Sequence, residues 1–250
     1  MDRKFWDDIF ENYNSEIFDV FKSDKNGIIK LWINDVASSR KTVADFGCGI
    51  GKWLPLLSRQ FGEVFAIDFS SSNLKYNKGK YKTFKNINYQ NIDMTQRIES
   101  SYNFDVILCV NAILNAAHSK RKNFFTNIFT NLNTKGHLIL VVPSLESVLY
   151  SEFISAKCDH KGGSNTKKTT RRIGKNEYIK FKQGIVNIDA IPTKHYLREE
   201  LISTLNEIGF KIVKFDKVKY PWSTEIANFP KSLKAPYPWD WVVMATKNKK

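Results

Sequence analysis

Three observations predict an α/β fold with a doubly wound, mostly parallel sheet for this chain of 250 residues. Short apolar runs alternate with amphipathic segments from residue 42 onward, which is the pattern of strands joined by helices. A glycine turn directly follows the first of these runs. Acidic or amide side chains end the first four runs, and ligands collect beyond the carboxyl ends of parallel strands. The sequence therefore predicts a ligand site at one edge of the sheet.

Composition is typical of a single globular domain over residues 1–250, with 42% hydrophobic and 14% aromatic residues. No apolar run is long enough to cross a bilayer, so we expect no membrane partner. The first residues carry acids and lack the apolar core of a signal peptide, which favours a cytoplasmic location. The cysteines are widely spaced and odd in number, which fits neither a zinc pattern nor a disulfide framework: Cys48, Cys109 and Cys158.

The net charge of +14 leaves two interpretations open. A basic balance can attract RNA, DNA or an anionic membrane. The chain is also rich in Lys, Asn and Ile, so the lysines can reflect genome composition and only solvate the surface. Their even spread along the chain favours this second interpretation.

The order of the expected elements follows from periodicity and capping signals. Residues 1–40 should form amphipathic helices, over 5–22 and 27–37. Strands are expected at 42–46, 63–70, 88–94, 104–111, 136–143, 211–220 and 239–246. Helices are expected from Gly51 to about Gln60, from Ser71 onward, and over 120–132, 144–157 and 193–208.

Local signals support several of these boundaries. Pro55 lies in the first turn of its helix, where its missing N–H is harmless. Ser70 is a cap residue for the helix that follows it, and Gly209 ends the helix over 193–208, with Leu197 and Leu201 among its buried residues.

Residues 144–192 form an insertion that we expect to act as a cap or lid over the substrate side. It contains a Gly-, Ser- and Lys-rich loop over 161–172 and a β-hairpin of 178–181 with 185–188. A proline- and aromatic-rich connection precedes the last strand. Its aromatic residues either line a substrate pocket or plug the sheet edge.

The glycine turn differs from a dinucleotide fingerprint, which has glycines at its first, third and sixth positions. Here the third glycine, Gly51, is at the fifth position, and Lys52 occupies the sixth. Asp45 precedes the first glycine, Gly47, by two residues. A carboxylate at this place suits a cationic ligand and would repel a pyrophosphate.

These residues resemble the class I S-adenosylmethionine-dependent methyltransferases, whose first motif is an acid, any residue, then Gly-x-Gly-x-Gly. The match is Asp45-Phe46-Gly47-Cys48-Gly49-Ile50-Gly51. The resemblance covers residues 42–142 well and the last two strands loosely. It implies a seven-stranded sheet with an antiparallel last strand, S-adenosylmethionine as cofactor, and no metal.

The resemblance also implies the residues that bind the cofactor. Asp68 lies about twenty residues beyond the turn, where a carboxylate accepts hydrogen bonds from ribose hydroxyls. Asp93 is placed for the adenine amino group, although an acid at a loop entry is ordinarily just solvated, and Met94 is placed for the adenine face. The full set is Asp45, Gly47, Cys48, Gly49, Gly51, Asp68, Phe69, Asp93, Met94, Val110 and Asn111.

The substrate side carries fewer signals. DNA and amide methyltransferases of this class have Asn/Asp-Pro-Pro-aromatic after the fourth strand, whereas this chain has Asn111-Ala112-Ile113-Leu114, which argues against methylation of adenine or glutamine. His118 and His195 are the candidate general bases, because imidazoles titrate near neutrality. Each can equally be a surface or packing residue. Candidate substrate contacts, for which core packing is the alternative, are Trp6, Tyr13, Tyr196 and Trp222.

We therefore expect a methyltransferase that acts on O, N or C of a small-molecule substrate. Its compact size, aromatic cap and lack of an added RNA-binding module favour this function. The alternative is methylation or binding of RNA through the basic surface. A methyltransferase fold that has lost catalysis is less favoured, because the motif from Asp45 to Gly51 is intact.

Overall fold

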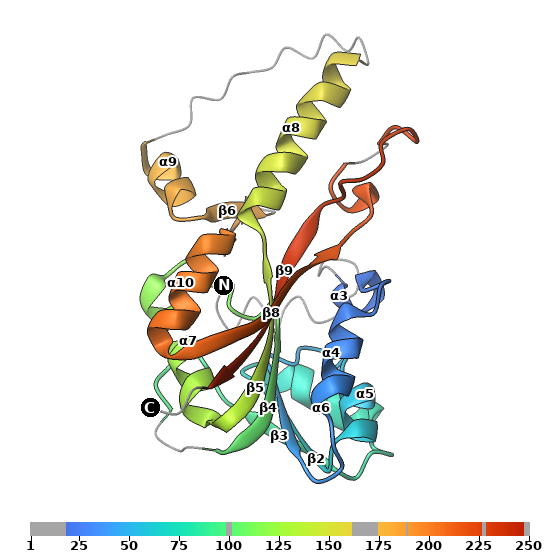
Figure 1. Cartoon of the computed structure of the whole chain (residues 1–250), viewed down its shortest axis with the longest axis vertical. Coiled ribbons are helices and arrows are strands. Elements are labelled where there is room, and N and C mark those ends of the chain that lie inside the picture. Colours follow the sequence, from blue (N-terminus) through green and yellow to red (C-terminus); the bar gives the residue numbers. More distant parts are fainter. Residues whose placement is uncertain (1–18, 99–101, 162–174, 189, 227–228, 248–250) are drawn as a thin grey trace.

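The computed structural model describes residues 19–98, 102–161, 175–188, 190–226 and 229–247 (Figure 1). A seven-stranded sheet forms its centre, in the order β3-β2-β1-β4-β5-β9-β8. The first five strands in the chain pair in parallel, and β9 is antiparallel to both of its neighbours. The strands are β1 (Thr42–Phe46), β2 (Glu63–Asp68), β3 (Ile87–Asn91), β4 (Phe104–Val110), β5 (Leu132–Pro143), β8 (Phe210–Lys219) and β9 (Trp239–Lys247). The predicted sheet is confirmed.

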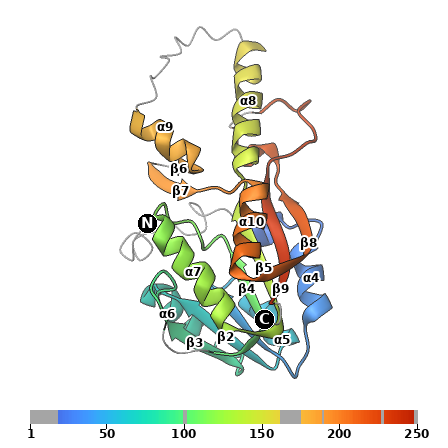
Figure 2. The same ribbon diagram turned by 60° about the vertical axis from the view of Figure 1, so that its left-hand side comes forward.

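Helices cover both faces of this sheet, as Figures 1 and 2 show. On one face lie α4 (Ile28–Val36), α5 (Leu54–Gln60) and α6 (Ser71–Lys80). On the other lie α7 (His118–Asn131) and α10 (Arg198–Ile208). The central strands are apolar on both sides for this reason: Val43 packs into the first core and Ala44 into the second.

Several predicted boundaries are confirmed by capping contacts. The Ser70 hydroxyl accepts a hydrogen bond from the Asn73 N–H at 3.2 Å, at the start of α6. Pro55 lies in the first turn of α5. Gly209 adopts a left-handed conformation with φ of 109° and ends α10. The expected amino-terminal helix over 5–22 lies mostly outside the described residues. Within them, α3 (Val20–Ser23) overlaps the end of this expected helix.

The segment after β5 differs from the prediction. It forms α8 (Leu145–Lys161), α9 (Lys175–Lys182), β6 (Ile185–Ile188) and β7 (Ile191–Lys194). The prediction of a strand at 178–181 is wrong, because these residues belong to α9. The hairpin is formed instead by β6 and β7, which pair antiparallel. Most of the expected loop over 161–172 lies outside the described residues.

The start of α10 also differs, for a tertiary reason. Residues 193–196 are extended and bond to the loop after β4 and to the end of β5. The Lys194 N–H donates to the Leu114 carbonyl at 2.9 Å, and the Tyr196 N–H donates to the Pro143 carbonyl at 2.8 Å. These long-range bonds hold the residues out of the helix. Leu197, expected to be buried, instead precedes α10 and is 40% exposed.

The packing of α4 gives a matched test of the first core. Ile33 is fully buried and Leu31 is 57% exposed in the same helix. We expect Ile33→Ala to lower the free energy of unfolding by about 2–5 kcal/mol, because it leaves a cavity. Leu31→Ala should change it by no more than about 0.5 kcal/mol. Urea denaturation measures both, and equal effects would show that α4 does not pack as described.

Candidate cofactor and acceptor site

The turn between β1 and α5 is held against the neighbouring strand by its own backbone. Gly47, Gly49 and Gly51 all have positive φ, of 75°, 50° and 71°. The N–H groups of Gly47 and Cys48 donate to the Ile67 carbonyl of β2, at 2.8 and 3.1 Å. Only glycine adopts these conformations cheaply, so the spacing of the motif follows from the path of the turn.

Gly47 also has no room for a side chain. A Cβ on this residue would lie 2.4 Å from the Cβ of Ala112, in the loop after β4. The space beside Gly47 is therefore filled by the protein, because the β1 turn and the loop after β4 touch at this point.

Asn77 of α6 binds the backbone of the glycine turn and was not predicted from the sequence. Its side chain is fully buried, and its amide Nδ2 donates to the Gly49 carbonyl at 2.8 Å. A Cβ on Gly51 would lie 2.8 Å from the Asn77 Oδ1. The sequence of α6 is mostly polar, so nothing in it separates Asn77 from the solvated polar residues around it.

Asp68 at the end of β2 binds backbone groups of the site. Its Oδ2 accepts from the Gly49 N–H and its Oδ1 from the Ser70 N–H, both at 2.8 Å. The carboxylate therefore links the glycine turn to the cap of α6. Its expected role toward ribose stays a prediction, and this place beside the turn is compatible with it.

Asp45 is a buried carboxyl group at the end of β1. It is 2% exposed, and its Oδ2 has no hydrogen-bond partner among the described residues. Burial, and secondarily the charge of Asp68, raise the pKa of Asp45 to about 8. An unsatisfied carboxyl oxygen here fits the cationic group of S-adenosylmethionine, whose charge would stabilise the ionised form.

The other expected cofactor residues lie at the same edge, and their roles stay predictions. The Asp93 Oδ1 accepts from both the N–H and the hydroxyl of Thr95, at 2.9 and 2.7 Å. Met94 and Cys48 are buried in the two cores. Phe69 and Val110 are half-buried.

Asn111 follows β4 with a φ of 48°, which lifts it out of the strand. Its N–H donates to the Val141 carbonyl of β5 at 3.0 Å. Its side-chain Nδ2 donates to the Oδ2 of Asp240 at 2.8 Å, while its buried Oδ1 has no hydrogen-bond partner among the described residues. Asp240, near the start of β9, was missed by the sequence analysis, because 129 residues separate it from Asn111.

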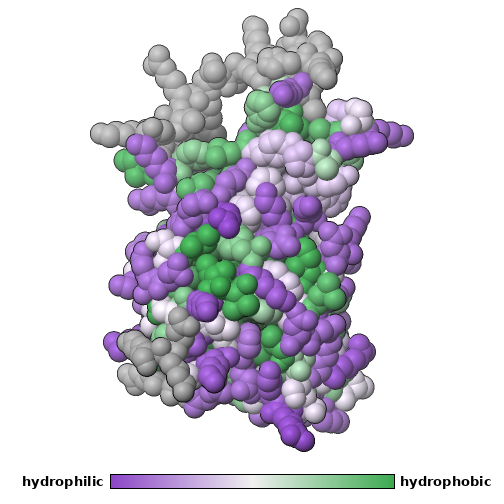
Figure 3. Space-filling model, in the orientation of Figure 1, coloured by the Kyte–Doolittle hydropathy of each residue, from purple (hydrophilic) through white to green (hydrophobic). Residues whose placement is uncertain are grey.

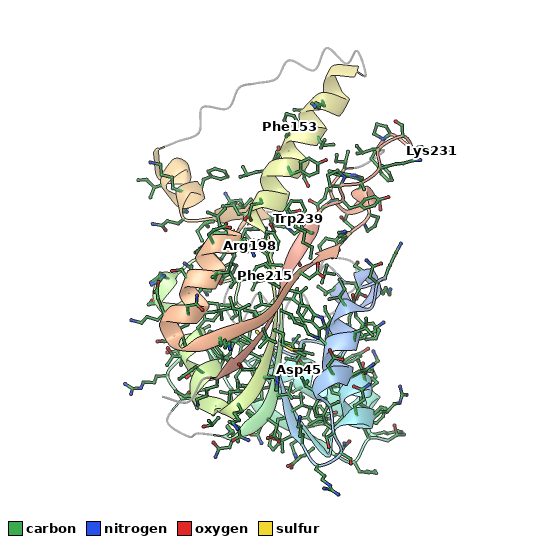
Figure 4. All side chains as sticks on the ribbon, viewed as in Figure 1. Asp45, Phe153, Arg198, Phe215, Lys231 and Trp239 are labelled. Carbon is green, nitrogen blue, oxygen red and sulfur yellow. The ribbon has the colours of Figure 1, made fainter. Side chains whose placement is uncertain are left out.

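Aromatic side chains gather where β9 begins beside α8, and Figure 4 labels Trp239 at this place. The Tyr150 ring lies 5.6 Å from that of Trp222 and 6.3 Å from that of Trp239. Trp222 is fully buried, and its Nε1 donates to the Lys234 carbonyl at 3.1 Å. These contacts show that the aromatic residues pack against one another at the sheet edge, and whether they also line a substrate pocket stays a prediction.

The candidate bases and substrate contacts lie in different environments. His118 is exposed at the start of α7. His195 is buried, and this burial lowers its pKa to about 4. Tyr196 is buried in the second core, where its hydroxyl donates to the Ile113 carbonyl at 2.8 Å. Trp6 and Tyr13 lie outside the described residues.

A scan of the described helices finds none with the length and apolar character needed to cross a membrane.

The Gly47–Ala112 contact can be tested by a double-mutant cycle. We expect Gly47→Ala to cost about 1–2 kcal/mol of unfolding free energy through its positive φ. The contact with Ala112 should add about 1–3 kcal/mol. In an Ala112→Gly background only the first cost should remain, as measured by urea denaturation. An equal cost in both backgrounds would mean that Ala112 does not fill this space.

The raised pKa of Asp45 predicts a pH dependence of stability. Its folded pKa of about 8 lies above its ordinary value of 3.8, so the folded state binds more protons between these values. The free energy of unfolding should therefore fall as the pH rises from about 4 to about 8, by at most about 1.4 kcal/mol per pH unit. Asp45→Asn, which has the shape of the protonated acid, should lack this part of the slope. Parallel slopes for the two proteins would contradict the pKa.

A family model described as a methyltransferase domain matches residues 43–136. No curated protein matches the chain by sequence. The fold is similar to that of a methyltransferase from Methanosarcina mazei, with 16% identity, 88% of this chain and 98% of that one covered, and a TM-score of 0.63.

Two further structures carry the reaction product of the cofactor. One is the 1,6-didemethyltoxoflavin-N1-methyltransferase of Burkholderia thailandensis, with S-adenosylhomocysteine: 12% identity, coverage of 99% and 87%, TM-score 0.65. The other is the N-methyltransferase NodS of Bradyrhizobium japonicum, also with S-adenosylhomocysteine: 12% identity, coverage of 98% and 99%, TM-score 0.62. Residues 43–136 therefore match a methyltransferase domain, and the fold of the chain is similar to that of S-adenosylmethionine-dependent methyltransferases.

Proposed function

We propose that this methyltransferase transfers the methyl group of S-adenosylmethionine to a small-molecule acceptor. The observation that carries the proposal is the buried pair of Asn111 and Asp240 beside the glycine turn, with aromatic rings from α8 and the β8–β9 connection nearby. Polar groups held among apolar walls suit recognition of a compact ligand.

The residues present fit the cofactor. The glycine turn presents backbone at close range, Asp68 lies at the strand end where ribose is expected, and Asp45 offers an unsatisfied oxygen to a cation. When bound, the cofactor supplies a methyl group on a positively charged sulfur, which a nucleophile displaces in line. The protein has to hold that nucleophile in position and remove its proton where it has one.

The segment 144–192 is proposed as the cap of the acceptor side. Figures 1 and 2 show α8, α9 and β6 beyond the end of the sheet where β5 leaves it. Leu149 and Phe153 of α8 and Ile179 of α9 are exposed apolar residues in this cap. Figure 3 shows hydrophobic residues in this upper part of the surface. A cap that covers a ligand would shield these side chains from water.

One structurally similar protein supports a small acceptor. The methyltransferase of Burkholderia thailandensis was crystallised with 1,6-didemethyltoxoflavin bound. By this likeness we extend only the class of acceptor to the present chain. The acceptor atom is left open by the fold, because one fold hosts many substrates.

His195 and His118 remain the candidate bases from the sequence, with different prospects. A general base works best when its pKa lies near the operating pH. Burial lowers the pKa of His195 to about 4, so it is a weak proton acceptor at neutrality. His118 is exposed and lies at the beginning of α7.

Methylation of RNA is the second candidate, favoured by the net charge of +14. A groove that guides a phosphate backbone to the site should be lined by Lys and Arg. The described groups that act on Asp240 and Tyr220 instead include the carboxylates of Glu225 and Asp24. These charges would repel phosphate, so we favour a small acceptor.

The test uses S-adenosylmethionine with a labelled methyl group, the full chain, and a fractionated cell extract. We expect label in the small-molecule fraction. Label confined to RNA would contradict the small acceptor and favour the second candidate, and label in no fraction would contradict activity on either.

A variant of Asp68 tests the cofactor side of the same assay. Asp68→Asn removes the charge and keeps one acceptor for the backbone N–H groups, so it should lower cofactor affinity about tenfold or more in calorimetry. Asp216→Asn, an exposed acid on β8, is the matched control and should bind normally. Unchanged affinity of the Asp68 variant would remove Asp68 from the cofactor site.

A further inference from the structure

We propose that the acceptor is an amine that binds in its cationic form, and that Asp240 is the residue that binds the amine and takes its proton. This inference rests on the proposed function and deepens it, because it names the chemical class of the substrate. Asp240 lies near the start of β9, and we assign it this role because it accepts a hydrogen bond from Asn111, which follows β4.

Asp240 is a buried carboxylate without a cation. It is 7% exposed, and its partners are the amide of Asn111, at 2.8 Å, and the hydroxyl of Tyr220. The ion pairs found in the described part of the chain use other carboxylates: Asp19, Asp35, Glu199 and Glu200. An ion in the interior costs several kcal/mol of desolvation, which a cation usually offsets.

The side chain that holds Asp240 has an unused acceptor of its own. The Asn111 Oδ1 is buried and has no hydrogen-bond partner in the described ranges, while its Nδ2 donates to Asp240. A buried acceptor without a donor costs free energy, so such a group is informative when it lies at a site. An ammonium group carries three donors and no acceptor, and it would satisfy both Asn111 and Asp240 at once.

The surrounding charges favour a cation further. Glu225 raises the pKa of Asp240 by its negative charge, and Glu152 acts on Glu225 in the same way. Asp24, from the turn after α3, acts on the hydroxyl of Tyr220 beside Asp240. In a chain of net charge +14, the negative charges of Glu225 and Asp24, which act on Asp240 and on Tyr220, run against the overall balance. Their field attracts an ammonium group and repels a carboxylate or phosphate.

Asp240 lies close to the glycine turn. Gly47 of the turn touches Ala112, and Asn111 is the residue before it. The glycine turn is thus linked to Asp240 by the contact of Gly47 with Ala112, by the peptide bond from Ala112 to Asn111, and by the hydrogen bond from Asn111 to Asp240. An amine held by Asn111 and Asp240 is beside the turn that is expected to hold the cofactor.

The chemistry balances with the groups named. The bound ammonium gives one proton to the Asp240 carboxylate and becomes a neutral amine. The nitrogen lone pair then forms a bond to the methyl carbon while the carbon–sulfur bond breaks, and the electron pair of that bond remains on sulfur. The products are the methylated ammonium and S-adenosylhomocysteine, and the proton on Asp240 leaves to water.

The protonation behaviour of Asp240 is compatible with this role. Burial, first, raises its pKa to about 6, against the hydrogen bonds from Tyr220 and Asn111. A group with a pKa near the operating pH is ionised before the reaction and still accepts a proton during it. The pKa of Asp240 lies closer to neutral pH than that of His195, which burial lowers to about 4.

The test uses the labelled small-molecule product from the extract assay. A methylated amine should bind a cation-exchange resin at neutral pH, and its label should survive mild alkali, whereas a methyl ester would lose it. Label in a neutral or anionic small molecule would overturn the amine and leave the proposed function standing. Label confined to RNA, or absent from every fraction, would overturn both.

Variants test Asp240 itself, with S-adenosylmethionine carrying the labelled methyl group and the unlabelled extract fraction that contains the acceptor amine as probes. Asp240→Asn keeps the shape and removes the charge, so kcat/KM for the amine should fall at least about 30-fold, with a raised KM. Cofactor affinity in calorimetry should change less than about threefold, because Asp240 itself is not among the residues expected to bind the cofactor. Asp240→Glu, which keeps the charge, should restore part of the activity, and Asp216→Asn should match the wild type. Full activity of Asp240→Asn would overturn the assignment, as would an equal loss in both Asp240 variants with normal folding and cofactor binding.

Discussion

The contact between the β1 turn and the loop after β4 is the constraint on which the site depends. Gly47 has no room for a side chain because Ala112 occupies that space, 2.4 Å from where a Cβ would be. The turn is fixed on its other side by the Ile67 carbonyl and by Asp68 of β2. Three neighbouring strands therefore position one turn. The boundary between the neighbouring strands β1 and β4 is also the switch point of the sheet, where the strand order reverses and where ligands bind in doubly wound folds.

The charge of this site is opposite in sign to the net charge of the chain. The chain is strongly basic, yet the carboxyl ends of the strands gather buried acids, Asp45, Asp68 and Asp240. Asp68 is stabilised by backbone N–H groups, whereas the Asp45 Oδ2 has no hydrogen-bond partner among the described residues, and burial raises the pKa of both Asp45 and Asp240. Burying unsatisfied acids lowers stability, and proteins retain such groups mainly at functional sites. Both ligands of the proposed reaction are cations, so buried acids at this edge suit them: Asp45 and Asp68 on the side of the cofactor and Asp240 on the side of the amine.

The sequence predicted the sheet and the cofactor turn because those signals are local. Alternating apolar runs identified all seven strands, and the motif from Asp45 to Gly51 lies within one strand and one turn. The errors have a common physical cause. Leu197 was assigned to a helix that begins later, because residues 193–196 bond to Leu114 and Pro143, distant in sequence. Asn77 and Asp240 were missed for the same reason, since each acts on a residue that only the fold brings near.

The two halves of the site thus differ in how they are encoded. The cofactor half is built from consecutive residues whose backbone conformation requires particular residue types, and such a pattern is readable in one sequence. The acceptor half is assembled from the end of β4, the start of β9 and the connection before it, so its chemistry arises from contacts between distant segments. The amino-acid sequence of a connecting segment can vary while the sheet stays intact, because its backbone conformation requires few particular residue types. This explains why one fold transfers a methyl group to many acceptors, and why the acceptor has to be inferred from buried groups such as Asp240 and the unused oxygen of Asn111.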